Sequence, residues 1–248
     1  MLNSQPALET ALAHRSIRKF TDQAIPENVL SAIIQAGQMA STSSYMQNVS
    51  IIRVTDKAKR AQIREVCANA YKGKLGHHYV ENCAEFLVFC ADAARHLHFA
   101  PNAQIDWTEV LLIGAVDAGI TAQNVLLTAE SLGLGGVYIG SLRNDLAQIT
   151  EILALPYGVF PLFGMCLGYP DHEPGQRPRL PMNIVLSENT YQNANEVELH
   201  TYDEVVKAYY KERSNLDLSW GDQIRSNLCT EVRPHLLAFA QKQGFAKK

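Results

Sequence analysis

The chain has 248 residues, 47% of them hydrophobic and 19% charged, with a formal net charge of -3. This composition is typical of a globular protein with a sizeable core, and the slightly acidic balance argues against a general nucleic-acid or membrane-surface binder. The five cysteines form no Cys-x-x-Cys pair, so we expect free thiols, no zinc site and a reducing, cytoplasmic location.

The first half of the chain alternates between helical and strand patterns. A helix is expected to open at Pro26, and Asp56 has the side chain of a helix N-cap. The predicted helices here are residues 6–13, 26–37 and 56–70. Strands are expected at 49–55 and 86–91, and the unbroken apolar run of the second indicates a strand covered on both faces.

Residues 106–132 are apolar nearly all round, which predicts a helix in the core or in a subunit interface. Asp117, Gln123 and Asn124 interrupt this run, so we do not interpret it as a membrane span. The glycines from 133 to 136 are expected to end the helix.

The second half predicts strands at 137–139 and 161–167, with a helix between them that is capped by Asn144 or Asp145 and ends at Leu155. Residues 171–200 show no helical period and are read as an extended excursion. Helices are expected again at about 202–212 and 220–243. Strands and helices mix without a repeat or a linker, so one α/β or α+β domain is predicted.

A basic cluster lies near the N-terminus, at His14-Arg15-Ser16-Ile17-Arg18. Guanidinium groups hold phosphate bidentately, and a serine adds a neutral donor. On charge alone such a cluster is more often a solvated surface. With nucleic acid disfavoured, a small phosphate-bearing cofactor is the better partner.

Other segments could complete such a site. Ser41–Ser44 could hydrogen-bond the heteroatoms of a flat ligand, although a plain polar turn is an equal alternative. Arg177 and Arg179 form a second basic pair. The glycines at 133–140 follow a helix and precede a strand, the reverse of a dinucleotide-binding fingerprint.

No acid–base or metal set is evident in the sequence. His77 and His78 are adjacent rather than four residues apart, which makes a metal site a weak hypothesis. Anion-holding groups without an acid–base pair favour chemistry that a cofactor carries.

Five segments, in this order along the chain, together resemble the motifs of a known family: residues 14–21, 41–44, 133–140, 161–164 and 177–181. The chain resembles the oxygen-insensitive NADPH nitroreductase and NADPH–FMN oxidoreductase branch of the nitroreductase superfamily. This implies an α+β fold, a three-layer α/β/α sandwich with a mixed sheet, in an intertwined homodimer with FMN at the interface. It also implies that the excursion, at about 171–235, packs on the partner subunit or covers the site.

The resemblance implies residue roles as well. The FMN-binding residues would be His14, Arg15, Ser16, Arg18, Thr42, Ser43, His77, Tyr138, Ile139, Gly140, Ser141, Arg177 and Arg179. Ser44, Tyr45 and Arg233 would face the substrate, and Arg213 would hold the 2′-phosphate of NADPH. The family often has a second arginine soon after this one, where this chain has Leu216-Asp217-Leu218, so weaker discrimination against NADH is expected.

The implied activity is two-electron, ping-pong reduction of nitroaromatics, quinones or related acceptors, with NADPH as the donor. Two alternatives stay open from the sequence. One is a flavin reductase that supplies reduced FMN to a partner enzyme, and the other is a flavin-binding protein without turnover. The segment at 70–76 also looks longer than in close relatives.

Overall fold

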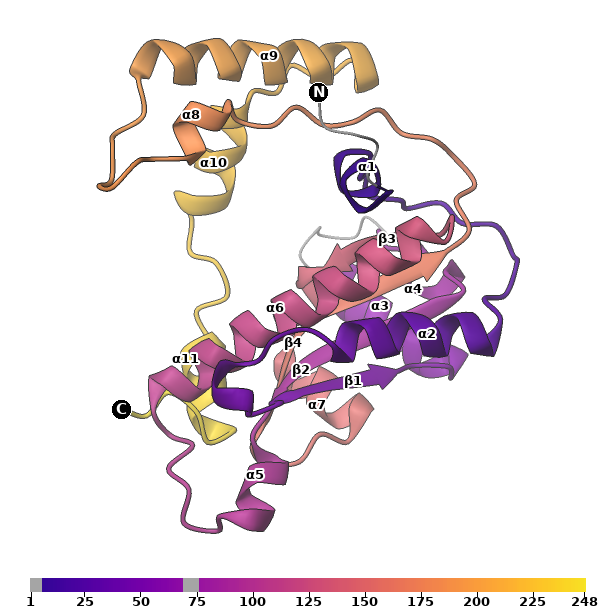
Figure 1. Cartoon of the computed structure of the whole chain (residues 1–248), viewed down its shortest axis with the longest axis vertical. Helices are drawn as coiled ribbons and strands as arrows, with labels where there is room; N and C mark the ends of the chain where they lie inside the picture. Colours follow the sequence, from indigo (N-terminus) through magenta and orange to yellow (C-terminus); the bar gives the residue numbers. More distant parts are fainter. Residues whose placement is uncertain (1–5, 69–75) are drawn as a thin grey trace. The chain divides into compact units, whose positions relative to one another are not determined.

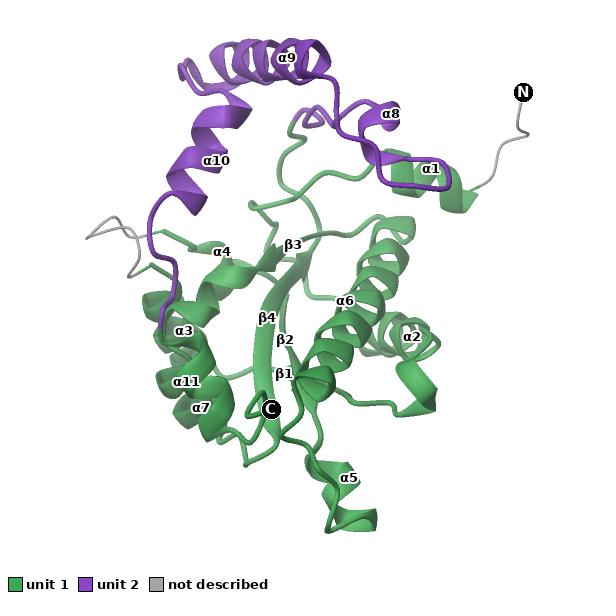
Figure 2. Ribbon diagram, turned by 90° about the vertical axis from the view of Figure 1, so that its left-hand side faces the viewer, with its two compact units in different colours: residues 1–174, 235–248 green, residues 175–234 purple. Residues whose placement is uncertain are grey.

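A computed structural model describes residues 6–68 and 76–248. Its internal contacts divide the chain into two compact units, Met1–Pro174 with His235–Lys248, and Gly175–Pro234 (Figure 2). The longer segment expected at 70–76, and the predicted end of the 56–70 helix, lie largely outside the described residues.

One antiparallel sheet forms the centre of the first unit. Its strands are β1 (Val49–Arg53), β2 (Glu85–Asp92), β3 (Gly135–Ile139) and β4 (Val159–Gly168). They lie in the order β1–β2–β4–β3, and every pairing between them is antiparallel. The α+β class is confirmed. The parallel pairing that a mixed sheet requires is not found among these described strands.

Helices cover both faces of this sheet. The elements of the first unit outside the sheet are α1 (Pro6–Leu12), α2 (Glu27–Gln38), η1 (Ser43–Tyr45), α3 (Lys57–Ala68), α4 (Tyr79–Asn82), α5 (Ala94–Phe99), α6 (Thr108–Ser131), η3 (Gly140–Asn144), α7 (Leu146–Leu153) and α11 (Leu236–Lys242). Figures 1 and 2 show α2 and α6 on one face and α3, α7 and α11 on the other, which gives three layers.

The side chains of β2 explain these layers. All its residues are buried, and successive side chains point to opposite faces. Phe86 and Val88 belong to the apolar cluster that also contains residues of α3, α7 and α11. Leu87 and Phe89 belong to the cluster with α2 and α6. The expectation of a strand covered on both faces is therefore confirmed.

Helix α6 is by length and composition able to cross a membrane. In this fold it packs against α2 and the sheet instead. Gly37 of α2 lies so near it that a Cβ there would be 2.5 Å from Val125 Cγ2. On its outer face, Leu112, Val116 and Ile120 are exposed.

The second unit, Gly175–Pro234, contains α8 (Met182–Val185), α9 (Glu196–Ser214) and α10 (Trp220–Leu228). Its small core is built from Tyr202, Val206 and Tyr210 of α9, with Trp220 packed against them.

Two expected boundaries were wrong. Helix α9 begins at Glu196 rather than near 202, because Asn195 caps it by accepting hydrogen bonds from Val197 N and Glu198 N. The predicted helix at 220–243 is two helices, α10 and α11. Pro234 lies between them, where a proline has no N–H to donate and its ring opposes a continuous helix.

Candidate functional site

The basic segment at 14–18 lies along strand β3. Ile17 N donates to Gly136 O at 3.0 Å, and a Cβ on Gly135 would come within 2.4 Å of the Ile17 side chain. Ile17 is buried, whereas Ser16 is partly exposed and Arg18 exposed. The backbone is thus fixed by the apolar residue, and the polar neighbours face outward.

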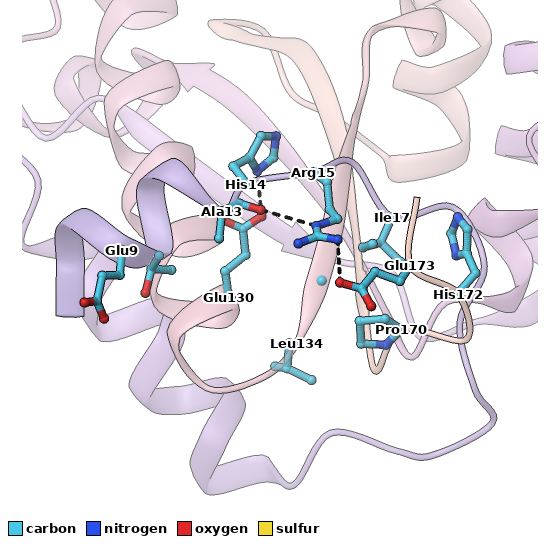
Figure 3. A pocket seen from close by; sticks show the side chains of 12 residues that line it. Glu9, Ala13, His14, Arg15, Ile17, Glu130, Leu134, Pro170, His172 and Glu173 are labelled. Carbon is cyan, nitrogen blue, oxygen red and sulfur yellow. Dashed lines mark hydrogen bonds and ion pairs between the residues drawn. The ribbon is translucent and has the colours of Figure 1, made fainter. Parts of the chain in front are cut away.

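His14 and Arg15 line a cavity of about 600 Å³ (Figure 3). His14 Nδ1 is 2.6 Å from Glu130 Oε1, near the end of α6. Arg15 Nη1 donates to Glu173 Oε1 at 2.6 Å. The Glu130 side chain is only 11% exposed and that of Glu173 is 80% exposed, so the two carboxylates differ sharply in burial.

Arg18 shares its surroundings with His77 and Tyr79. Burial and then the charge of Arg18 lower the pKa of His77, so its imidazole is neutral at pH 7. Burial raises the pKa of Tyr79, and Arg18 partly opposes this rise. His77 Nε2 lies 3.0 Å from Ser141 Oγ. Four residues from three distant parts of the chain therefore lie close together here, and three of the four are expected site residues.

Strand β3 leads directly into this group. Tyr138 is 37% exposed, Ile139 is buried, and Gly140 begins the short η3 helix that contains Ser141. Tyr138 Oη donates to Gln123 Oε1 at 3.2 Å, and burial, aided by the charge of Glu130, raises the pKa of Tyr138 to about 12. Its phenol therefore stays neutral at physiological pH.

The turn at 42–45 lies beside a different part of α6. Ser43 N donates to both carboxylate oxygens of Asp117, at 3.2 and 3.1 Å. Ser44 and Tyr45 have positive φ, and Tyr45 is 81% exposed. Thr42 borders a cavity of about 340 Å³. Asp117 is a residue that sequence reasoning missed, because its partner is 74 residues away.

The second unit carries the other expected cations. Arg177 lies over the ring of Tyr210 at 5.7 Å, and Arg179 Nη1 donates to Arg177 O at 3.4 Å. Arg213 lies over the ring of Tyr209 and donates to its Oη at 3.1 Å. Arg233 has a positive φ of 51°. That Arg177 and Arg179 bind the same cofactor as Arg15 and Arg18 stays a prediction.

The donor set of the first unit fits a cofactor with a phosphate and a flat polar ring. Two guanidinium groups, an imidazole and a serine hydroxyl follow one another on a segment held against β3, with Tyr138 to Ser141 beside it. Over residues 6–68 and 76–248, no group of three His, Cys, Asp or Glu side chains is placed to hold a metal ion.

Two family profiles match the chain. The profile of the nitroreductase family covers residues 11–169, and that of the nitroreductase family, C-terminal domain, covers residues 177–248. The border between the two matches lies close to the border between the two structural units.

Individual relatives match over the full length. The chain is 51% identical to an NADPH-flavin oxidoreductase from Vibrio harveyi, over 97% of this chain and 98% of the relative. It is 45% identical to an oxygen-insensitive NADPH nitroreductase from Salmonella typhimurium, over 98% and 99%. The crystal structure of nitroreductase A from Vibrio parahaemolyticus superposes with a TM-score of 0.93 at 49% identity, covering 99% of this chain and 100% of that one.

Proposed function

The chain belongs to the nitroreductase family, and on that premise we propose how its own residues serve an FMN-dependent oxidoreductase that takes electrons from NADPH. The protein is an enzyme, one of the NADPH-dependent oxidoreductases that act on flavins and nitro compounds. The observation that supports the assignment of residues is the anchored segment 14–18, whose Arg18 side chain lies near His77, the partner of Ser141.

Arg15 and Arg18 are proposed to hold the FMN phosphate, with Ser16 as a neutral donor. The neutral His77 and Ser141 are proposed to hydrogen-bond the polar edge of the ring, and Gly140 to let the backbone approach it. When bound, FMN would supply the hydride and two-electron transfer chemistry that links NADPH to the acceptor. The protein supplies position and charge.

Two copies of the chain are proposed to build each site. Asp117, which holds the 42–45 turn, and Glu130, which holds His14, are thirteen residues apart on α6. At 1.5 Å per residue this is about 20 Å along the helix. The turn of one protomer therefore fits the site of the other better than its own. The exposed apolar face of α6, with Val116 and Ile120, supports a homodimer.

Arg213 is proposed to contact the 2′-phosphate of NADPH. Its ring contact with Tyr209 orients a guanidinium that is otherwise exposed. Asp217, close to the position of the missing second arginine, forms an ion pair with Lys207 at 3.3 Å. The net preference for NADPH over NADH is therefore expected to be modest. We also propose a cytoplasmic location, which the five free cysteines support.

The first experiment is FMN binding. Purified protein should be yellow and should release FMN on denaturation. Arg18→Ala should weaken FMN binding about tenfold or more, because a charge-assisted contact to phosphate is lost. Lys19→Ala is the matched control, since it removes the same charge from the adjacent exposed position. Equal FMN affinity in the Arg18 variant and the wild type would refute the role of Arg18.

The second experiment separates nicotinamide recognition from catalysis. Arg213→Ala should raise KM for NADPH and leave KM for NADH nearly unchanged. An equal effect on both donors would remove the proposed phosphate contact.

A flavin reductase is the second candidate, favoured by the Vibrio harveyi relative that is named NADPH-flavin oxidoreductase. Competition between free FMN and nitrofurazone as acceptors would rank the two activities. A higher kcat/KM for free FMN favours the flavin reductase.

A further inference from the structure

We propose that Glu130 is a positioning residue for cofactor binding, which orients His14 and strengthens its contact with the FMN phosphate. The proposal rests on the proposed function for the identity of the ligand. It assigns a task to a side chain of α6 that lies outside the basic segment itself.

The first observation is the contact itself. Glu130 Oε1 and His14 Nδ1 are 2.6 Å apart, and the two residues are 116 positions apart in the chain (Figure 3). A carboxylate can only accept, so Nδ1 carries the hydrogen and donates it. This fixes both the tautomer and the plane of the ring, as an outer partner does for a histidine that binds a ligand.

The second observation is what the contact leaves available. His14 Nε2 makes no hydrogen bond with any residue in the described part of the chain. The His14 side chain is 27% exposed and borders the 600 Å³ cavity. With Nδ1 engaged, Nε2 is the remaining ring atom for a ligand. When the ring carries both hydrogens, Nδ1 donates to the Glu130 carboxylate and Nε2 can donate to a phosphate.

The third observation is the burial of the carboxylate. The Glu130 side chain is 11% exposed, and its Oε2 is buried without a partner among the described residues. A buried charge of this kind is costly to desolvate. Glu173, the partner of Arg15, shows the opposite pattern, since 80% of its side chain is exposed. Water can therefore take the place of the Glu173 carboxylate on Arg15, but it has little access to the Glu130 carboxylate on His14.

The experiment compares FMN with riboflavin, which lacks the phosphate. Glu130→Gln keeps the size of the side chain and removes its charge. It should weaken FMN binding about tenfold, while riboflavin affinity stays unchanged. Glu109→Gln removes the same charge from an exposed position of the same helix and should change neither affinity.

A double-mutant cycle tests whether Glu130 acts on FMN binding through His14. If Glu130 acts through His14, Glu130→Gln should have no further effect on FMN affinity in a His14→Ala background. Equal loss of FMN and riboflavin binding, or additive effects of the two substitutions, would overturn the proposal. Failure of the wild type to bind FMN would instead refute the proposed function. An unchanged FMN affinity in Glu130→Gln, with normal wild-type binding, would refute this inference alone.

Discussion

His77 lies between Arg18 and Ser141, two other residues proposed to bind FMN. Its backbone has a positive φ of 63°, and its Nε2 lies 3.0 Å from Ser141 Oγ. Burial and the charge of Arg18 lower its pKa below the ordinary 6.5. Protonation of this imidazole would therefore place a second positive charge beside Arg18, in a partly desolvated position.

This arrangement predicts an acid-sensitive contribution to stability. Below pH 6.5 the unfolded chain binds a proton at residue 77 while the folded chain still does not. Because the unfolded state then holds more protons, the free energy of unfolding falls as pH falls, and the effect is absent above pH 6.5. Denaturant unfolding of the apoprotein at several pH values between 5 and 8 measures this change in the free energy of unfolding. These pH values bracket the ordinary pKa of histidine.

The variant for this test is His77→Asn, since asparagine tolerates positive φ. Its unfolding free energy should depend less on pH in the acid range than that of the wild type. His78→Asn, at the exposed neighbouring position, is the control. Identical pH profiles for His77→Asn and the wild type would contradict the assignment.

Among the elements, α6 does most to arrange the candidate site, because it holds two segments that are far from it in sequence. Asp117 accepts from Ser43 N, and Glu130 binds His14. Between them, Val125 and Leu126 pack the helix into the core. One rigid element thereby fixes the spacing of the 42–45 turn and the basic segment.

Asp117→Asn tests the first of these attachments. Only one oxygen remains to accept from Ser43 N, and the charge is lost, so the free energy of unfolding should fall by about 1–2 kcal/mol. The strained turn should open locally, which hydrogen exchange at the Ser43 amide would report. Glu109→Gln removes a charge from an exposed position of the same helix and should leave that amide protected. Unchanged exchange in Asp117→Asn would contradict the prediction.

The elements also show what the sequence could reveal. Strand β2 and helix α6 could be predicted because long apolar runs have few alternatives. The break between α10 and α11 was missed because the helical spacing continues across it, and only Pro234 signals the end. The start of α9 depends on a hydrogen bond from a single side chain, Asn195, in a polar stretch.

The candidate site was predictable only in part, for a related physical reason. The basic segment stands out as a local pattern of charge. Its partners Glu130 and Glu173 are 116 and 158 residues away, and no spacing rule connects residues that only the fold brings together. Asp117, an acid in the middle of an apolar helix, was visible in the sequence only as an interruption of that helix.

At the scale of the whole molecule, the outer face of α6 is the proposed dimer interface. Leu112, Val116 and Ile120 are 56%, 52% and 43% exposed and recur every four residues, so they form one apolar stripe. Val116→Arg should shift the protein from dimer to monomer in sedimentation experiments. FMN affinity should fall with it, because the proposed site takes the 42–45 turn from the second protomer.

Leu237→Arg is the control for this experiment, since Leu237 is 60% exposed on α11, on the other side of the sheet. It should leave the assembly unchanged. A wild type that sediments as a monomer, or a Val116→Arg variant that stays dimeric, would argue against the proposed interface.

The anchored basic segment has a second consequence, which concerns solubility. Strand β3 is the last strand in the order β1–β2–β4–β3, and an open outer edge is a template for pairing with other chains. Ile17 N donates a hydrogen bond to Gly136 O of this strand. Three residues further along the chain, Phe20 pairs with Pro170 in an isolated β-bridge. The segment that carries the residues proposed to bind FMN thus also shields an edge against aggregation through Ile17 and Phe20, so losing this segment would promote aggregation as well as loss of the cofactor.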